Sequence, residues 1–244
     1  MVAVPQVAVN VTFIKKMTNV NTYRFESNVS EEIASNYYTE KRYVRMVEIF
    51  FLRKYKKLYQ YQILCTKFDF SDQDTAIGFL LKKISYLFDE LDVYADEENN
   101  IVKINNIFSL RLRWQELKVK LGETNKGDAV ENYFRSISSV LDNEENLIAF
   151  LQSYNMFGLY FNGQLGQYLD DGKRIRVIAE EKMEYLNKEN LSPEKTKIKM
   201  KVSEDKNENY IEGTSIYEKG VLKENFVLSR ENKCEIKYSL LWVG

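Results

Sequence analysis

Hydrophobic positions in the first seventy residues recur at every second residue, which is the period of a β-strand. The clearest run is residues 43–52, which is rich in β-branched and aromatic side chains. In the next run, residues 58–68, four side chains share one face: Tyr59, Tyr61, Ile63 and Cys65. The connection 53–57 is short enough for a hairpin, although it lacks the Asn-Gly pair of a tight turn. Weaker strand patterns occur at residues 7–14 and 22–25.

From Ser71 the hydrophobic period changes to three or four residues, which is the period of an α-helix. Residues 71–74 match a capping box, in which the serine side chain accepts a hydrogen bond from a free backbone N–H. The apolar stripe that follows predicts an amphipathic helix of about five turns: Ile77, Leu80, Leu81, Ile84, Leu87, Phe88 and Leu91. We then expect an acidic loop at residues 92–100 and a short strand at 101–104.

Three more helices are predicted before residue 170. The first carries its apolar stripe from Ile107 to Leu121 and ends at Gly122, a residue type that favours helix ends. The next begins at about Asp128. Residues 142–145 read as the cap of the last helix, which presents Leu147, Ile148 and Leu151 on one face.

Strand patterns return after residue 172. Residues 174–178 predict one strand, residues 187–194 form a polar break, and residues 197–202 alternate cleanly between lysine and apolar side chains. Residues 210–228 predict a hairpin that turns at Lys219 and Gly220, and a last strand covers residues 235–243.

The order of strands, helices and strands indicates an α+β fold rather than alternating βαβ units. Clean alternation implies a sheet with one wet face, which is typical of antiparallel sheets. We therefore predict one unit over residues 1–244, with mostly strands at 1–70, mostly helices at 71–170 and mostly strands at 171–244. An antiparallel, curved sheet built from the N- and C-terminal strands would carry the central four-helix segment; two small sheets are the alternative.

The chain contains no histidine. This removes the commonest general base, the commonest metal ligand and every Ser-His or Cys-His nucleophile pair. Phosphate-binding glycine motifs and Cys-x-x-Cys pairs are also missing from the sequence. The acidic residues from Asp89 to Glu98 could supply oxygen ligands, but they lack the spacing of a calcium loop. We expect no catalytic residues, no metal site and no cofactor, and hence a protein that is not an enzyme.

The two cysteines, Cys65 and Cys234, lie far apart in apolar runs, which predicts reduced, buried thiols rather than a disulfide framework. No apolar stretch approaches the roughly 20 residues that span a bilayer. The start of the chain lacks the basic and apolar regions of a signal peptide. We therefore expect a cytoplasmic protein, and the abundance of Lys, Asn, Ile, Glu and Tyr is typical of bacteria with AT-rich genomes.

A basic segment surrounds the first predicted hairpin. Its candidate patch consists of Arg53, Lys54, Lys56 and Lys57, with tyrosines among them. Cations with aromatic rings on a sheet can hold single-stranded nucleic acid. The formal net charge of −1 argues against this partner, and a hairpin with a charged tip is the simpler interpretation.

An aromatic and glycine-rich run follows the last predicted helix. Its members are Tyr154, Phe157, Tyr160, Phe161 and Tyr168, which crowd around three glycines. Tyrosine and phenylalanine dominate the cores of protein interfaces, so these five form a candidate contact surface. The alternative is that the run packs under the sheet as part of the core.

Three functions remain open. The first is a non-catalytic protein that binds another protein or itself, as an adaptor, a client-specific chaperone, an immunity-type inhibitor or a subunit of a larger machine such as a secretion apparatus. The second is a carrier or sensor of a small apolar ligand held between sheet and helices, which requires a closed apolar cavity of at least about 300 Å³. The third is an enzyme that uses carboxylates or lysine, such as a metal-assisted hydrolase, which requires such groups to converge in a cleft.

Overall fold

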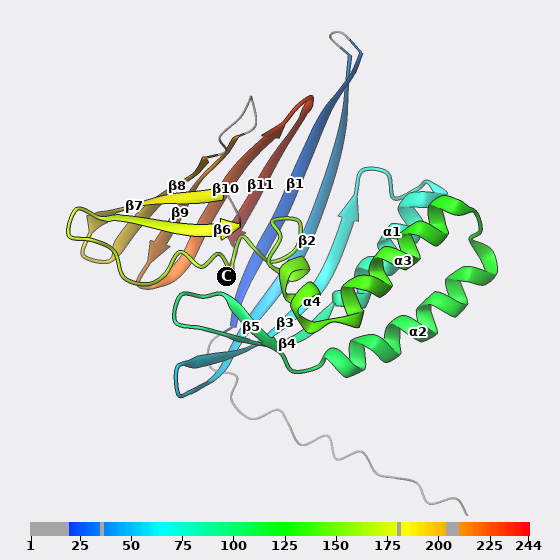
Figure 1. Ribbon diagram of the computed structural model, residues 1–244, viewed down its shortest axis with the longest axis horizontal. Coiled ribbons are helices and arrows are strands. Elements are labelled where there is room, and N and C mark those ends of the chain that lie inside the picture. The colour runs from blue at the N-terminus through cyan, green and yellow to red at the C-terminus, as the bar shows by residue number, and fades with distance from the viewer. Residues whose placement is uncertain (1–19, 35–36, 180–181, 204–209) are drawn as a thin grey trace, which may run out of the picture.

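The computed structural model describes residues 20–34, 37–179, 182–203 and 210–244. Within these ranges, eleven strands form one antiparallel sheet that is accompanied by four α-helices (Figure 1). The strands are β1 (Val20–Ala34), β2 (Tyr37–Tyr55), β3 (Leu58–Phe70), β4 (Glu90–Ala95), β5 (Ile101–Ile104), β6 (Lys173–Ala179), β7 (Lys182–Ser192), β8 (Lys195–Ser203), β9 (Tyr210–Glu218), β10 (Val221–Glu231) and β11 (Cys234–Trp242). The predicted α+β class with an antiparallel sheet is confirmed.

The sheet order is β5-β4-β3-β2-β1-β11-β10-β9-β8-β7-β6. Each half is therefore a run of sequential antiparallel neighbours, and the two halves meet where β1 pairs with β11. This pairing places Tyr23 opposite Trp242 and Glu31 opposite Cys234. The N- and C-terminal strand groups thus share one sheet, and the alternative of two small sheets is wrong.

Alternation predicted several strands correctly. In β8 the apolar positions Ile198, Met200 and Val202 are buried while the lysines between them face out. Hairpins form where they were expected, between β2 and β3 and between β9 and β10. The expected polar break at 187–194 is wrong, because residues up to Ser192 pair with β8 as part of β7. The strand expected at residues 7–14 lies outside the described residues.

The first helix, α1 (Ala76–Ser85), is shorter than expected and starts later. Its N-cap is Thr75, whose hydroxyl accepts from the Gly78 backbone N–H at 2.9 Å, so the cap predicted at Ser71 is wrong. A short 3₁₀ helix, η1 (Tyr86–Phe88), follows, and Leu91 belongs to β4. The helical stripe ends there because residues 90–95 alternate and pair with β3. Part of the expected acidic loop is therefore strand.

The other helices lie close to their predicted positions: α2 (Ile107–Thr124), α3 (Asp128–Asp142) and α4 (Glu144–Leu151). The Asn143 side chain caps α4 by accepting from the Glu145 backbone N–H at 2.7 Å. Helix α2 passes through Gly122 and ends two residues later, so that glycine is not its terminator. Figure 1 shows the helices beside the half of the sheet that contains β1 to β5, and α1 contacts β3 while α4 contacts β5.

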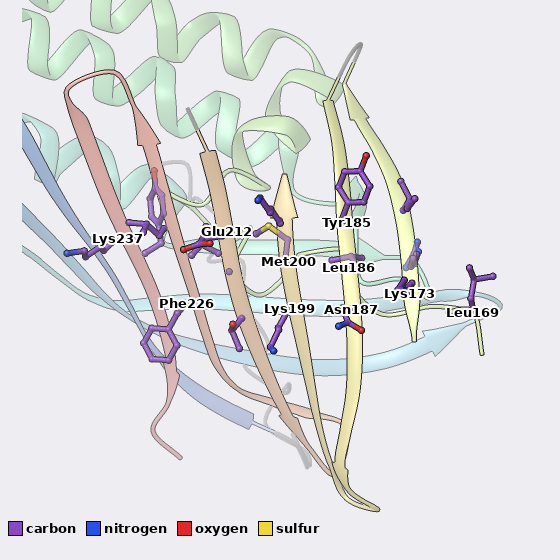
Figure 2. A pocket seen from close by; sticks show the side chains of 18 residues that line it. Leu169, Lys173, Tyr185, Leu186, Asn187, Lys199, Met200, Glu212, Phe226 and Lys237 are labelled. Atoms are coloured by element: carbon purple, nitrogen blue, oxygen red, sulfur yellow. The ribbon is translucent and has the colours of Figure 1, made fainter. Parts of the chain in front are cut away.

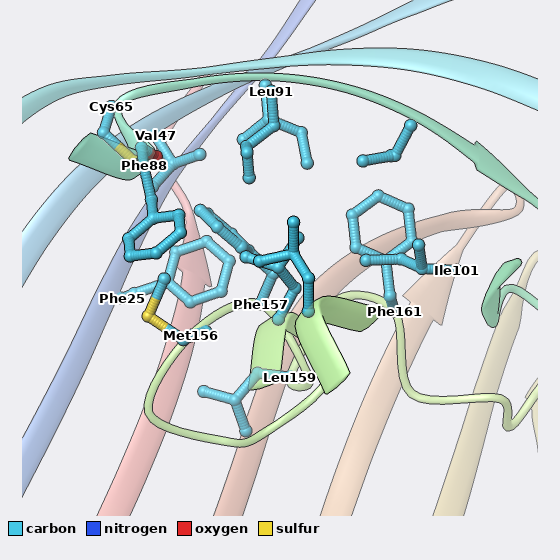
Figure 3. Packing of buried hydrophobic residues seen from close by; sticks show 14 of the residues in the cluster. Phe25, Val47, Cys65, Phe88, Leu91, Ile101, Met156, Phe157, Leu159 and Phe161 are labelled. Atoms are coloured by element: carbon cyan, nitrogen blue, oxygen red, sulfur yellow. Dashed lines mark hydrogen bonds between the residues drawn. The ribbon is translucent and has the colours of Figure 1, made fainter. Parts of the chain in front are cut away.

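Buried apolar side chains from strands and helices form one core cluster (Figure 3). Leu91, Phe157 and Leu240 are among its fully buried members, although they come from distant parts of the chain. Burial of apolar area at about 25 cal/mol per Å² is the main stabilising term of such a core. Among the described helices, none combines the length and hydropathy that a bilayer span requires.

Candidate ligand-binding groove

The aromatic and glycine-rich run lies over the inner face of the sheet, meaning the face turned toward the core. Phe157 and Phe161 are 0% and 1% exposed, which accords with the packing alternative and removes both side chains from the accessible surface. Tyr154, Tyr160 and Tyr168 are half-buried and pack against the same core. The run therefore acts first as a structural cover, although its tyrosines keep partial exposure.

Buried polar contacts fix this cover to the sheet. Asn225 on β10 donates to the Leu159 carbonyl at 2.7 Å, and the Ser215 hydroxyl donates to the Gln164 side-chain carbonyl at 2.6 Å. Arg176 on β6 donates to the Asn162 carbonyl at 3.0 Å. Because a buried polar group without a partner costs about 1–3 kcal/mol, these contacts set the position of the segment.

The predicted basic patch lies at the exposed end of the β2–β3 hairpin. Arg53 donates to the Gln60 side chain at 2.7 Å, and Lys54 donates to the Tyr59 hydroxyl at 2.9 Å. Lys56 and Lys57 form the turn itself, with Lys56 at a φ of 55°. The patch is the tip of a hairpin, as the simpler interpretation predicts, and its four residues do not line the two hollows described below.

The acidic residues between 89 and 98 make separate structural contacts. Asp89 pairs with Arg113 at 2.6 Å, and Glu98 pairs with Arg174 at 2.6 Å. Asp92 accepts from the Gln60 and Asn105 side chains. Across residues 20–34, 37–179, 182–203 and 210–244, no three acidic or thiol side chains gather as a metal site would require.

A groove of about 390 Å³ separates the inner face of the sheet from the helices. Its floor comes from β1, β2, β3 and β11, and its roof comes from α1, α3, α4 and residues 154–159. Apolar side chains line both surfaces: Phe25, Val29, Phe70, Ile84, Phe88 and Phe150. The volume lies at the lower end of the range of about 300–1,000 Å³ that is typical of small-molecule pockets. The groove is partly open to solvent.

Arg45 is the cationic residue in this apolar lining. Its guanidinium donates to the Asn155 carbonyl at 2.8 Å and to the Met156 sulfur at 3.5 Å. It also lies over the rings of Phe68 and Phe157, at 5.5 and 5.6 Å from their centroids. Desolvation lowers the pKa of the Arg45 guanidinium below its ordinary value. In the part of the chain that the structure describes, no carboxylate forms an ion pair with it.

The other charged residue of the lining, Glu26, is already paired. Its carboxylate binds Arg24 and Arg42, and the Arg42 Nε–Oε1 distance is 2.7 Å. These cations hold the pKa of the Glu26 carboxyl below its usual value, with the Arg42 hydrogen bond as the largest cause. Since neighbouring residues of a strand point to opposite faces, the Glu26 side chain points to the outer face while Phe25 and Ser27 face the groove.

Phenol groups provide further polar atoms, beside the side chains of Ser27, Ser85 and Asn155. Tyr43, Tyr133 and Tyr154 line the groove. Burial raises the pKa of Tyr133 and of Tyr154 above the ordinary tyrosine value. Both phenols therefore stay neutral at physiological pH. The groove thus offers one positive charge, neutral phenols and a mainly apolar wall.

A second hollow, of about 910 Å³, lies on the outer face of β6 to β11 (Figure 2). We call it the outer trough. Side chains in register across the strands line it, including Tyr185, Lys201, Glu212 and Leu228. Phe226 is 45% exposed there, and Ile175 on the edge strand β6 is 61% exposed. The trough combines exposed apolar side chains with a lysine-rich border.

Arg45 precedes the predicted basic patch in the strand run 43–52, and its place in the groove was not predicted from the sequence. The signal was present in the strand period. Tyr43, Arg45, Val47 and Ile49 are spaced by two, so the face that holds two buried apolar residues also holds the arginine. A cation on an apolar face is the pattern that distinguishes Arg45 from the exposed cations around it.

No family model matches the chain, and no curated protein matches it. Among solved structures, it is similar to a chain described under the words "lipid-protein interactions in lipovitellin". That likeness has a TM-score of 0.44 and 9% identity, and it covers 92% of this chain and 25% of the other. This chain thus spans about a quarter of the length of that protein.

Proposed function

We propose that this protein is a non-catalytic carrier or sensor of a small apolar ligand, held in the groove between sheet and helices. The observation that supports the proposal is the apolar groove of about 390 Å³, which exceeds the minimum volume of about 300 Å³ but is partly open, where a closed cavity was expected. The proposal includes the finer fold prediction, namely that the sheet curves around its ligand and that the four-helix segment packs on it as a roof.

The chemistry of the lining favours binding over catalysis. Catalytic carboxylates or lysines are expected to converge and to perturb one another's pKa values. In the groove, the single carboxylate of the lining is paired with arginines on the other face, and the single cation lies over aromatic rings. A wall of this kind suits the exclusion of water from an apolar molecule.

Binding of a neutral apolar fluorophore, N-phenyl-1-naphthylamine, tests the proposal. We expect saturable binding to the full chain at one site. Ser27→Phe places a ring in the groove and should abolish that binding. Asn28→Phe places the same ring on the opposite face of β1 and should leave binding unchanged. Saturable binding that Ser27→Phe leaves intact, or none at all in the folded protein, would contradict the proposal.

The outer trough supports a second function, the binding of another protein or of a second copy. Exposed apolar side chains at Ile175 and Phe226, with the open edge of β6, are features that protein partners use. Analytical ultracentrifugation of the full chain should show an oligomer, or a complex with a captured partner, that Phe226→Ser weakens. A monomer whose pull-downs are unaffected by Phe226→Ser would exclude this surface.

A further inference from the structure

We propose that Arg45 binds the carboxylate of a medium-chain amphiphile whose apolar tail lies in the groove. This inference rests on the proposed function and names the class of ligand. The groove has a mainly apolar wall and one cation, Arg45, that has no carboxylate partner among the described residues.

The hydrogen-bond capacity of Arg45 is only partly used. A guanidinium carries five N–H donors in a planar fork. Two contacts are formed to protein atoms, at the Asn155 carbonyl and the Met156 sulfur. Since sulfur is a weak acceptor, most of the fork remains for another acceptor. A carboxylate matches such a fork with two parallel hydrogen bonds, which are about twice as strong as neutral ones.

The position of Arg45 is costly without an anion. Removing a cation from water is unfavourable unless it is paired, and the lowered pKa of Arg45 reflects that desolvation. The rings of Phe68 and Phe157 offset part of this cost through cation–π contacts and hold the guanidinium on the inner face. A ligand carboxylate would complete the pairing beside a mainly apolar wall.

The charge and size of the site limit the ligand. With one free cation in its lining, the groove is matched to a single negative charge rather than to a multiply charged phosphate. A volume of about 390 Å³ suits one apolar chain or a small ring system rather than two long chains. The hydroxyl groups of Tyr43, Tyr133 and Tyr154, which line the groove, are hydrogen-bond donors for the same head group.

Competition experiments separate the head group from the tail. Dodecanoate and 1-dodecanol have the same chain length and are each used to displace N-phenyl-1-naphthylamine from the full protein at pH 8. We expect dodecanoate to bind roughly tenfold or more tightly than the alcohol. A tenfold change in affinity corresponds to about 1.4 kcal/mol, which is about the margin by which a hydrogen bond to a charged group exceeds a neutral one. Arg45→Gln should remove that preference, so that acid and alcohol displace the fluorophore with equal affinities, each referred to the fluorophore affinity measured for the same variant.

Arg135→Gln is the matched control, because Arg135 is exposed on α3 and does not line the groove. It should retain the preference for dodecanoate. Equal affinities for acid and alcohol in the unmodified protein, or a preference that survives Arg45→Gln, would overturn the role of Arg45 while the groove remains a binding site. If neither the fluorophore nor either competitor binds, the proposed function itself fails.

Discussion

The two cysteines differ in their surroundings although both are reduced. Cys65 is 7% exposed on β3, and its thiol lies 3.9 Å from the Phe88 carbonyl. Burial raises the pKa of Cys65 to about 12, whereas Cys234 is half-buried and its pKa is raised above the usual value mainly by desolvation. The thiolate is the reactive form, so burial and pKa both protect Cys65.

We therefore expect one thiol to react with Ellman's reagent in the native protein at pH 8. Cys234→Ser should abolish the fast reaction, and Cys65→Ser should leave it intact. In denaturant both thiols should react in the unmodified chain. Equal rates for the two thiols in the folded protein would show that Cys65 on β3 is as accessible to the reagent as Cys234 on β11.

At the residue scale, the sequence predicted the buried thiol at Cys65 and the general location of the basic patch. The prediction that Cys234 is also buried is wrong, because that residue is half-buried, and the groove was not predicted. A groove forms between elements that are distant in the chain, here β1, β2, β11 and three helices. Periodicity assigns a side chain to a face and cannot show what lies opposite that face. Arg45 could be assigned to the apolar face from sequence, and its neighbours Asn155 and Met156 could not.

At the element scale, two glycines differ in the space that is available for a side chain at their positions. Gly158 lies in the turn that follows α4, where a Cβ atom would approach backbone atoms of Gln152 and Ser153 more closely than 3.0 Å. Gly122 lies inside α2, where a Cβ atom would meet nothing within 4 Å. The first glycine is required by close packing, and the second only reduces helix propensity.

Alanine at the two positions should change stability in opposite directions. Gly158→Ala should lower the free energy of unfolding by about 1–3 kcal/mol, as overpacking usually does. Gly122→Ala should raise it by about 0.5–1 kcal/mol, because alanine favours the helix. Urea unfolding followed by circular dichroism measures both changes. A neutral Gly158→Ala would mean that the turn can move away from Gln152.

Most elements could be predicted from period alone, and the errors have a common cause. The segment from Ser71 to Leu91 carried one continuous helical stripe, yet only residues 76–85 are α-helical. Residues 90–95 instead form a strand that pairs with β3, because Leu91 and Val93 can face the core from a strand as well as from a helix. Tertiary pairing therefore overrode the local period, and a single sequence does not encode which partner strand is available.

At the scale of the whole molecule, buried and half-buried tyrosines are the most numerous groups in the described residues whose pKa is raised by burial. Eight have pKa values raised by desolvation: Tyr23, Tyr61, Tyr133, Tyr154, Tyr160, Tyr168, Tyr217 and Tyr238. For Tyr61, Tyr168 and Tyr238, burial raises the pKa to about 12. An unfolded tyrosine ionises near pH 10, so above that pH the unfolded chain holds fewer protons than the folded one.

Stability should consequently fall steeply as the pH rises above about 10. Each such tyrosine contributes up to about 1.4 kcal/mol of lost stability per pH unit between its unfolded and folded pKa values. The urea concentration at the midpoint of unfolding should change little near neutral pH, because the chain has no histidine to titrate there. Tyr238→Phe should reduce the alkaline loss, whereas Tyr55→Phe, at a 60% exposed site, should not. A midpoint that is flat through pH 11 would contradict this account.

The pairing of β1 with β11 also imposes an order on biosynthesis. When the N-terminal half of the sheet has left the ribosome, β1 has β2 on one side and an open backbone edge on the other. That edge stays unpaired until residues 234–242 emerge, and contacts of such high sequence separation form slowly. The nascent chain therefore passes through a stage in which its central strand is a site for aggregation or for a chaperone. Slower translation of the last two hairpins should lengthen that stage and lower the yield of folded protein.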